Sequence, residues 1–524
     1  MSAPAQVFAA TLLASLAKAG VRNFYLAPGA RSQALAIAAG QLAQANIINL
    51  HVRLDERGMA FQALGAALAS GEPSVLITTS GTAVANLHPA VLEANHSGVP
   101  LILLTADRPD ELRGVGANQT TTQVGIFADA VRECFDVVAP TGADTEPQEA
   151  ADLAIDAISL AMGYDGEQPG PVQINLAFRE PLSSTSPDAA ALDPVIALPN
   201  IFEPNPEFAI LDSALPTVVI AGAGAGEDAV EVAEAFGWPL LAEPSSGARV
   251  GSNAIAGYRQ ILDKNQALTD QIRRVIVYGK PTLGRAVIRL LFNPQIEVVV
   301  IKSKTHGHFD VSRRAAHIVD EITVTDEVEF EWLEAWRLAD AAQSHAVANG
   351  LNRRALVEQV WAATNFADAL VLGASRLIRE ADLWAPAKAV RVFSNRGLAG
   401  IDGTIATATG VAQVQNSGTT RALMGDLTFL HDAGSLVFDS SEAPLNLQIV
   451  VGNDAGGSIF AGLEMAQSLD ETSFKRLFTT PQQVDLWHLA QAYGWQYLRV
   501  EKLEELTSAL QTSGRVVIDV RLAD

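Results

Sequence analysis

Short aliphatic runs alternate with alanine-rich stretches of helical spacing through the first third of the chain. Each run ends in a turn with polar residues; the runs are Phe24–Ala27, Ile47–Val52, Val75–Thr79 and Leu101–Thr105. Such an alternation is typical of parallel strands covered by helices. It predicts an α/β fold whose ligand-binding edge lies at the carboxyl ends of the strands.

The same pattern resumes twice further along the chain. Val218–Ala221, Val275–Tyr278 and Val298–Ile301 indicate a second α/β unit, and Val390–Phe393, Leu447–Val451 and Val516–Val520 indicate a third. A stretch from Thr185 to Glu207 is punctuated by prolines and lacks a pattern. For 524 residues we therefore expect three domains, 1–184, 208–335 and 352–524, each a doubly wound parallel sheet.

The N-terminal stretch Val7–Leu16 is apolar enough to imitate a signal peptide. No positively charged side chain precedes it, and Phe8, Leu12 and Leu16 recur at helical spacing, which favours a core helix. No run reaches the roughly 18 apolar residues that a membrane span needs. We expect a cytoplasmic protein without a membrane partner.

Composition narrows the possible partners. Hydrophobic residues make up 48% and charged residues 18%, as in a well-packed globular enzyme, and 36 basic against 59 acidic side chains give a net charge of −23. This charge disfavours nucleic acid and anionic membranes, so anionic substrates must be met by locally placed arginines. The single cysteine, Cys134, excludes an intrachain disulfide and fits a reducing compartment.

Two segments that follow strand-like runs carry oxygen ligands. The first is Gly425-Asp426, and the second is Asn453-Asp454-Ala455-Gly456-Gly457. Asn453 follows Asp426 by 453 − 426 = 27 positions. Mg²⁺ takes oxygen ligands from carboxylates, carbonyls, phosphates and water. Asp426 provides the first ligand, Asn453 or Asp454 the second, and a backbone carbonyl of the glycine turn, Ala455 or Gly456, the third. A lone Gly-Asp pair is usually a turn, but the spaced pair predicts a cage for a magnesium diphosphate.

The spaced pair resembles the diphosphate motif of thiamine-diphosphate enzymes. Gly452 stands where that family often has the first of two asparagines. Counting from Asp426 makes Asn453 the metal ligand, whereas counting back from the glycine turn makes it Asp454. The resemblance implies that residues 1–184 bind the cofactor's pyrimidine and that residues 352–524 bind its diphosphate and Mg²⁺.

Glu56 lies in Leu54-Asp55-Glu56-Arg57-Gly58, at the predicted start of a helix. Taken alone, it is a solvated carboxylate favoured by the helix dipole. The family resemblance gives it the catalytic role of activating the cofactor through its pyrimidine ring, a task for a partly desolvated carboxylic acid. Because that glutamate and the diphosphate cage meet across a subunit interface in the family, the resemblance also implies a homodimer or tetramer.

Further segments resemble the branch of this family that joins 2-oxoglutarate to isochorismate in menaquinone biosynthesis. They run in order along nearly the whole chain: Ala27–Ser32, Asp55–Gly58, Thr79–Asn86, Leu104–Pro109, Gly116–Gln119, Ser394–Gly397 and Gly400–Gly403. The implied reaction decarboxylates 2-oxoglutarate and adds the remaining four-carbon unit to the ring of isochorismate. Both substrates are polyanions, which arginine forks bind well.

The resemblance assigns roles residue by residue. The implied substrate-binding residues are Arg31, Arg108, Asn118, Gln119, Arg285, Ser375, Arg379, Arg396 and Phe460. The implied cofactor-binding residues are Glu56, Ser80, Gly81, Thr82, Ile401, Gly425, Asp426, Asn453, Asp454 and Gly456, with Asp426, Asn453, Asp454 and Gly456 at the metal. Ile401 is the expected apolar wedge beneath the cofactor, and Ala30 replaces a serine usual in the family.

Three alternatives remain at this point, of which the third, a non-catalytic nucleotide-binding module, has no evident need of Glu56 alongside the Mg²⁺ cage. The first keeps the cofactor and changes the substrates, as in acetohydroxyacid synthase or another 2-oxo acid decarboxylase, which need fewer arginines. The second is a flavin or nicotinamide oxidoreductase that uses Gly222–Gly226 after a strand, with Glu243 as the acidic ribose partner. That segment departs from G-x-G-x-x-G at the third glycine, which favours a structural turn.

Overall fold

The computed structural model describes residues 3–183, 187–202, 204–212, 214–303, 307–325, 331–343, 350–415 and 417–522. The chain divides into two compact units. Unit 1 comprises Met1–Pro204, Ile405–Gln415 and Gly434–Pro444, and unit 2 comprises Asn205–Thr404, Asn416–Ala433 and Leu445–Asp524. Two short stretches from the last third of the chain therefore belong to unit 1.

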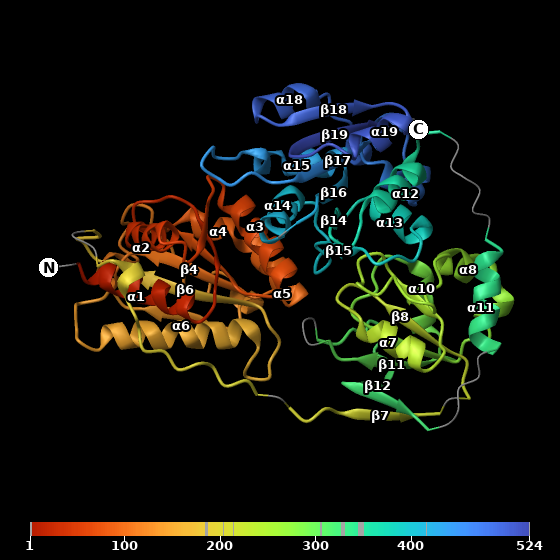
Figure 1. Cartoon of the computed structure of the whole chain (residues 1–524), viewed down its shortest axis with the longest axis horizontal. Helices are drawn as coiled ribbons and strands as arrows, with labels where there is room; N and C mark the ends of the chain where they lie inside the picture. The colour runs from red at the N-terminus through yellow and green to blue at the C-terminus, as the bar shows by residue number, and fades with distance from the viewer. Residues whose placement is uncertain are drawn as a thin grey trace. The chain divides into compact units, whose positions relative to one another are not determined.

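Unit 1 is built on a parallel sheet with the strand order β2-β1-β3-β4-β6-β5. Its strands are β1 (Asn23–Leu26), β2 (Asn49–Val52), β3 (Ser74–Thr78), β4 (Leu101–Asp107), β5 (Cys134–Val137) and β6 (Pro171–Ala177). Its helices include α1 (Pro4–Lys18), α2 (Gln33–Gln44), α3 (Glu56–Ser70), α4 (Thr82–Asn86), α5 (His88–Ser97), α6 (Glu146–Met162) and α14 (Thr404–Val414). Figure 1 shows α1 and α6 side by side against this sheet.

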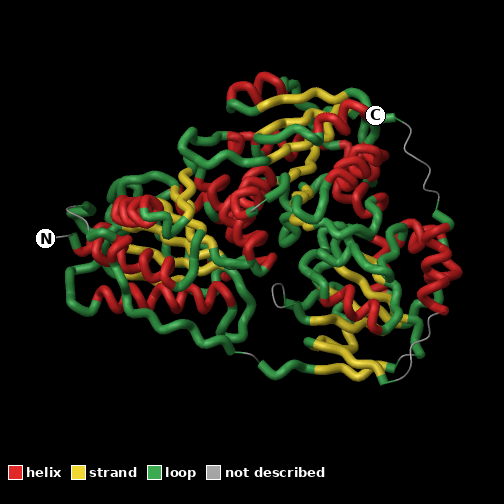
Figure 2. The backbone as a smooth tube through the Cα atoms, in the orientation of Figure 1, coloured by secondary structure: helices red, strands yellow, loops and turns green. Residues whose placement is uncertain are grey.

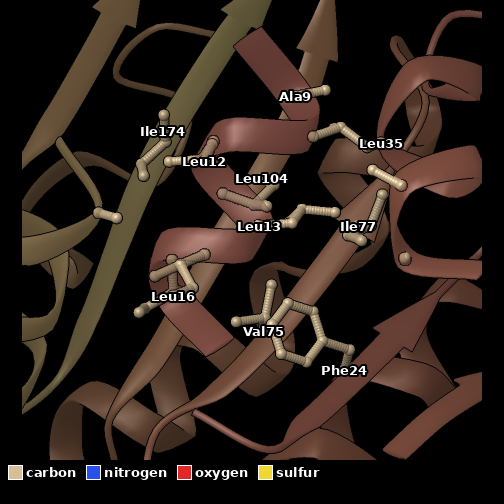
Figure 3. Close-up of a cluster of buried hydrophobic side chains, with 14 of the residues drawn as sticks. Ala9, Leu12, Leu13, Leu16, Phe24, Leu35, Val75, Ile77, Leu104 and Ile174 are labelled. Atoms are coloured by element: carbon tan, nitrogen blue, oxygen red, sulfur yellow. The ribbon is translucent and has the colours of Figure 1, made fainter. Parts of the chain in front are cut away.

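Alternating side chains on β1 divide the core of unit 1 into two layers. Phe24 and Leu26 pack with α1, α2 and α6, whereas Tyr25 between them packs with α3 and α5. Strand side chains alternate between the two faces of a sheet, so both faces of β1 are buried. Figure 3 shows Leu12, Leu13 and Leu16 of α1 directed at strand residues of the first layer. The N-terminal stretch is a core helix, as the helical spacing predicted.

Unit 2 contains two further parallel sheets. The second sheet has the order β12-β11-β10-β8-β9, and the third has the order β15-β14-β16-β17-β19-β18. The strands of the second are β8 (Thr217–Ala221), β9 (Leu240–Ala242), β10 (Arg274–Tyr278), β11 (Glu297–Ile301) and β12 (Ala315–Val319), with β7 (Phe208–Leu211) paired separately to β13 (Glu321–Val324). The strands of the third are β14 (Ala369–Leu372), β15 (Arg391–Phe393), β16 (Thr420–Gly425), β17 (Leu447–Asn453), β18 (Gln496–Val500) and β19 (Arg515–Arg521).

Helices surround these sheets along the sequence. They are α7 (Asp228–Ala235), α8 (Tyr258–Lys264), α9 (Gln266–Thr269), α10 (Arg285–Phe292), α11 (Glu331–Ala341), α12 (Arg353–Ala363), α13 (Arg376–Trp384), α15 (Asp426–His431), α16 (Met465–Ser468), α17 (Glu471–Phe474), α18 (Leu486–Ala492) and α19 (Leu503–Ala509). In the second sheet, Val218 and Ile220 pack toward α8 and α10, and Val219 and Ala221 pack toward α7. Helices therefore cover both faces of that sheet.

The expected α/β fold is confirmed, since the named strands of the described residues pair in parallel throughout. Each strand run named from the sequence overlaps a strand. Residues 192–202, within the unpatterned stretch, form a loop (Figure 2), whereas Thr185 lies outside the described residues. No helix in the described part of the chain is long and apolar enough to cross a membrane.

Each large sheet has a point where the strand order reverses. These points lie between β1 and β3, between β8 and β10, and between β14 and β16. Ligands of open α/β sheets bind in the crevice outside the carboxyl ends of the strands at such points. The turns that follow these strands are therefore the first places to look for a functional site.

Candidate cofactor and substrate site

The predicted metal cage lies at the carboxyl ends of β16 and β17. Asp426 is the first residue of α15, is 6% exposed, and accepts a 2.9 Å hydrogen bond from the N–H of Leu427. Burial, followed by the negative charge of Asp454, raises the pKa of Asp426 to about 6. Two carboxylates thus repel each other in a poorly hydrated place, and a dication between them would relieve that repulsion.

Asn453 and Asp454 both have partners within unit 2. The Asn453 amide nitrogen donates to Asp519 Oδ1 at 3.0 Å, while its oxygen accepts the N–H of Ala455 at 3.3 Å. Asp454 Oδ2 accepts from Arg353 Nη2 at 2.7 Å and from Nε at 3.0 Å. Both residues therefore remain candidates for the second metal ligand.

The turn after these residues has a backbone that only glycine fits. Gly456 has φ +138°, and a Cβ placed on it would lie 2.5 Å from the carbonyl oxygen of Thr479. The main chain of Gly456 also donates to Asp426, which lowers the pKa of that carboxyl slightly against the larger effect of burial. The turn therefore brings backbone groups beside the proposed metal ligand.

The described residues hold no group of three or more His, Cys, Asp or Glu side chains arranged for a metal. The donors gathered here are instead a buried carboxylate, an amide, a second carboxylate and main-chain groups. This set fits Mg²⁺, which is commonly bound by one or two protein carboxylates and completed by phosphates and water.

Unit 1 gathers a second set of predicted residues after β3 and β4. Arg108 donates from Nη1 to the Ser80 hydroxyl and from Nη2 to the carbonyl of Asn118 at 2.8 Å. Ser80 Oγ donates to the carbonyl of Gln119, and the Gln119 amide donates back to the carbonyl of Ser80, both at 2.9 Å. Gly81, with φ +84°, leads into α4 at Thr82. One polar cluster thus contains Arg108, Ser80, Asn118 and Gln119.

The positive charge of Arg31 interacts with that of Arg108 in this cluster. Arg31 is 9% exposed and donates from Nη1 to the carbonyl of Phe178 at 2.9 Å, with Glu180 Oε1 at 4.0 Å from Nη2. Burial, followed by the positive charge of Arg108, lowers the pKa of Arg31. Two neighbouring guanidinium groups with little water are a suitable place for an anion.

Glu56 is the first residue of α3, after the N-cap Asp55, and its side chain is half-buried. Asn86 Nδ2 lies 3.5 Å from Glu56 Oε2. Asp55 and Gly58 on either side of it line a cavity of 220 Å³ in unit 1 together with Arg53 and Phe438. The predicted cofactor-activating residue therefore belongs to unit 1, and the predicted metal cage belongs to unit 2.

Three more predicted residues lie together in unit 2. Ser375 is the N-cap of α13, where its hydroxyl accepts the N–H of Leu377 at 3.2 Å. Arg379 donates to the carbonyl of Ser375 at 3.3 Å. Burial, followed by the positive charges of Arg396 and Arg259, lowers the pKa of Arg379. This is a second pair of predicted arginines, Arg379 and Arg396, that repel each other.

The remaining predicted residues are dispersed. Arg285 begins α10 and is exposed. Ile401 is half-buried in the loop after β15, and Phe460 contacts Phe478 with ring centroids 5.8 Å apart. Gly222 is needed for backbone packing, because a Cβ at this position would lie 2.0 Å from the nitrogen of Pro281.

Asp382 and Arg259 in unit 2 form a charged pair that no sequence motif predicted. Asp382 is fully buried, accepts a 2.5 Å hydrogen bond from Tyr258 Oη and forms an ion pair with Arg259. Glu243 is 1% exposed, and the negative charge of Asp382 acts on its carboxyl. Arg259 and Asp382 occupy helices with no local motif, so only the tertiary fold reveals their association.

Both halves of the proposed site match models of known domains. Residues 7–126 match the thiamine pyrophosphate enzyme N-terminal TPP binding domain, and residues 379–520 match the C-terminal TPP binding domain. The first match contains Glu56 and the Arg108 cluster, and the second contains Arg379, Arg396 and the Asp426 cage.

Relatives that align over nearly the whole chain share one name, 2-succinyl-5-enolpyruvyl-6-hydroxy-3-cyclohexene-1-carboxylate synthase. The protein of Leifsonia xyli subsp. xyli is 44% identical, covering 99% of this chain and 96% of its own length. That of Clavibacter michiganensis subsp. michiganensis is 43% identical over 96% of this chain and 94% of its own. That of Kineococcus radiotolerans is 42% identical over 98% and 94%.

Proposed function

The chain belongs to the 2-succinyl-5-enolpyruvyl-6-hydroxy-3-cyclohexene-1-carboxylate synthase family, and on this basis we propose that it is the transferase that decarboxylates 2-oxoglutarate and adds the four-carbon unit to isochorismate. The observation that carries this function is the match of the whole chain to synthases of that name, together with both cofactor-binding domains. This step belongs to menaquinone biosynthesis.

Thiamine diphosphate, when bound, supplies the carbon nucleophile that makes decarboxylation of a 2-oxo acid possible. Glu56 would hold a proton against the cofactor's pyrimidine ring, and Ser80, Gly81 and Thr82, between β3 and the start of α4, would also bind the cofactor. Asp426, with Asn453 or Asp454 and the main chain of Gly456, would hold Mg²⁺ and the diphosphate beside Gly425. Support for the metal site comes from the pKa of Asp426, which burial and then Asp454 raise to about 6.

The substrates would be held by the two arginine pairs. Arg31 with Arg108, and Arg379 with Arg396, each bring like charges together, and a substrate carboxylate would relieve their repulsion. Arg31, Arg108 and Arg396 are buried, whereas Arg379 is exposed. Asn118, Gln119 and Ser375 would add neutral hydrogen bonds to the substrates, and Phe460 an apolar contact, whereas Ile401 would be the apolar wedge beneath the cofactor. Arg285, exposed at the start of α10, remains a weaker member of the proposed set.

We also propose three domains with the boundaries expected from the sequence, and a cytoplasmic homodimer or tetramer whose cofactor sites are shared between protomers. The matches to an N-terminal and a C-terminal cofactor-binding domain support a division of labour between the ends of the chain. Sedimentation equilibrium of the purified protein tests the assembly, and a monomer that retains full activity would contradict it.

The function is tested with purified protein, thiamine diphosphate, Mg²⁺, 2-oxoglutarate and isochorismate. We expect carbon dioxide and the adduct in equal amounts, measured by coupled absorbance and mass spectrometry. Pyruvate replaces both substrates in a parallel reaction, because acetohydroxyacid synthase would form its product from pyruvate alone. Comparable turnover of pyruvate, or carbon dioxide release without the adduct, would contradict the proposal.

A further inference from the structure

Glu243 is an acidic side chain to which the proposed mechanism gives no role. It follows β9, is 1% exposed, and its Oε1 accepts the main-chain N–H of Leu283 at 2.7 Å. Its other oxygen, Oε2, is buried without a hydrogen-bond partner among the described residues. Burying a carboxylate in this way is unfavourable unless the group is protonated or paired with a positive charge.

The turn that Glu243 holds also contacts a proposed substrate arginine. Arg396 Nη2 donates to Thr282 Oγ1 at 2.5 Å, and Leu283 is the next residue. Arg396 is 8% exposed, so its guanidinium has little freedom to find another position. The Glu243 carboxyl and the Arg396 guanidinium are thus connected through one short turn.

Among the described residues, three charged or titratable groups interact electrostatically with Glu243: Asp382 on α13, Tyr258 on α8 and Arg396 in the loop after β15. Arg249 donates to the carbonyl of the preceding residue, Ala242, and Arg259 and Arg379 act on Asp382. Burial, followed by the negative charge of Asp382, raises the pKa of Glu243 to about 8, whereas Arg396 acts in the opposite direction. Glu243 is therefore mostly protonated at pH 7 and loses its proton as the pH rises through about 8.

We propose that Glu243 is a positioning residue for anionic substrate: it anchors the Thr282–Leu283 turn, and this turn holds the Arg396 guanidinium toward a substrate carboxylate. The proposal rests on the proposed function, in which Arg396 binds substrate. An uncharged Glu243 leaves the positive charge of Arg396 available to that carboxylate. An ionised Glu243 offsets this charge and competes for Arg396.

Two variants separate anchoring from charge. Glu243→Gln keeps an oxygen that can accept the N–H of Leu283 and stays neutral at every pH. Glu243→Ala removes the anchor. The matched control is Glu234→Gln, because Glu234 Oε1 accepts the N–H of Ser252 at 2.8 Å in another turn of unit 2, which holds no proposed substrate arginine.

Steady-state kinetics with 2-oxoglutarate and isochorismate at pH 7, 8 and 9 provide the test. For the wild type we expect KM of at least one substrate to rise about tenfold from pH 7 to pH 9, with kcat nearly constant. In Glu243→Gln this rise disappears. In Glu243→Ala the KM is about tenfold higher already at pH 7, and Glu234→Gln follows the wild type.

The proposal is overturned if Glu243→Gln shows the same rise in KM as the wild type, or if Glu243→Ala leaves both KM values unchanged at pH 7. Circular dichroism and thermal unfolding establish that each variant is folded, and if Glu243→Ala is not, the pH profile of Glu243→Gln decides. A wild type that forms no adduct refutes the proposed function instead, so the two failures are distinct.

Discussion

Glu442 Oε2 lies 3.0 Å from His51 Nδ1. The other carboxylate oxygen of Glu442 accepts the main-chain N–H of Val52 at 2.9 Å and lies 3.9 Å from Arg53 Nη1. Val52 ends β2, four residues before Glu56 along the sequence, so 56 − 52 = 4. Glu442 therefore fixes the strand end from which the chain reaches the proposed catalytic glutamate.

Glu442→Gln should lower the stability of unit 1 in a pH-dependent way. Burial raises the pKa of Glu442, but hydrogen bonds from His51 and Val52 together with nearby positive charge outweigh it, so the pKa lies below its usual range. A lowered folded-state pKa stabilises the protein above the unfolded value near 4.3, and this stability is lost as the pH falls through the folded value.

We expect Glu442→Gln to lose about 1–3 kcal/mol at pH 7, and less as the pH approaches 4. Thermal unfolding at both pH values measures the difference. Glu471→Gln is the control, since Glu471 forms an exposed ion pair with Lys475, which contributes little. An equal loss at pH 7 and pH 4 would contradict the electrostatic explanation.

Asp426→Asn should affect the cofactor-free and cofactor-bound protein in opposite directions. Removing the charge relieves the repulsion between Asp426 and Asp454, so the protein in EDTA should be stabilised by about 1–2 kcal/mol. The stabilisation that Mg²⁺ and thiamine diphosphate give the wild type should disappear, because a ligand stabilises only the state that binds it. Thermal unfolding with and without both ligands tests this, and an unchanged ligand-induced shift would remove Asp426 from the metal site.

Glu56→Gln should reduce carbon dioxide release by about 10²–10⁴-fold, the usual contribution of a positioned acid or base. The shift in unfolding temperature caused by thiamine diphosphate and Mg²⁺ should largely persist, since the proposed metal ligands are untouched. Glu72→Gln, an exposed carboxylate just beyond the end of α3, is the control. Near-normal turnover of Glu56→Gln would refute the assigned role.

Gly456→Ala and Gly462→Ala form a matched pair in the segment after β17, where Gly462 ends a short 3-10 helix. A Cβ at Gly456 would lie 2.5 Å from the carbonyl oxygen of Thr479 at a φ of +138°, whereas a Cβ at Gly462 meets nothing within 4 Å. We expect Gly456→Ala to weaken activation by Mg²⁺ at least about tenfold, because the displaced turn includes a proposed metal ligand. Gly462→Ala should match the wild type, and equal behaviour of the two variants would show that the turn does not form the cage.

The central strands could be predicted from the sequence because they are buried on both faces. β4 is apolar for four residues, and β17 for most of its length. The apolar pattern of β6 is interrupted by Gln173 and Asn175, so the sequence does not indicate this strand. Both side chains are buried. Asn175 accepts hydrogen bonds from Thr105 and Gln123, and Gln173 donates to the Thr105 hydroxyl. Pairing of polar side chains depends on tertiary contacts, so a residue-by-residue pattern cannot reveal it.

The same distinction applies to the candidate site. Asp426 begins the helix that directly follows β16, and Ser80 and Gly456 lie in the turns shortly after β3 and β17, so such local motifs are visible in the sequence. Asp382 and Glu243 come together from a helix and a strand end that are 382 − 243 = 139 residues apart. No spacing rule predicts that encounter, and it is found only by following buried charges through the fold.

Variants of Arg108 and Arg132 can distinguish a substrate-binding arginine from a structural one within unit 1. Both donate to several partners: Arg108 to Ser80 and Asn118, and Arg132 to Asn95 at 2.6 Å and to the carbonyl of Pro169 at 2.7 Å. Lysine cannot reproduce either fork, because its ammonium is a single point of donation. Arg108→Lys should therefore raise the KM of an anionic substrate about tenfold with a small effect on stability. Arg132→Lys should lower the unfolding temperature and leave KM unchanged, since nothing near Arg132 was predicted to bind substrate. If Arg108→Lys behaved like Arg132→Lys in both measurements, the cluster after β3 and β4 would be a structural network and the substrate site would have to lie elsewhere.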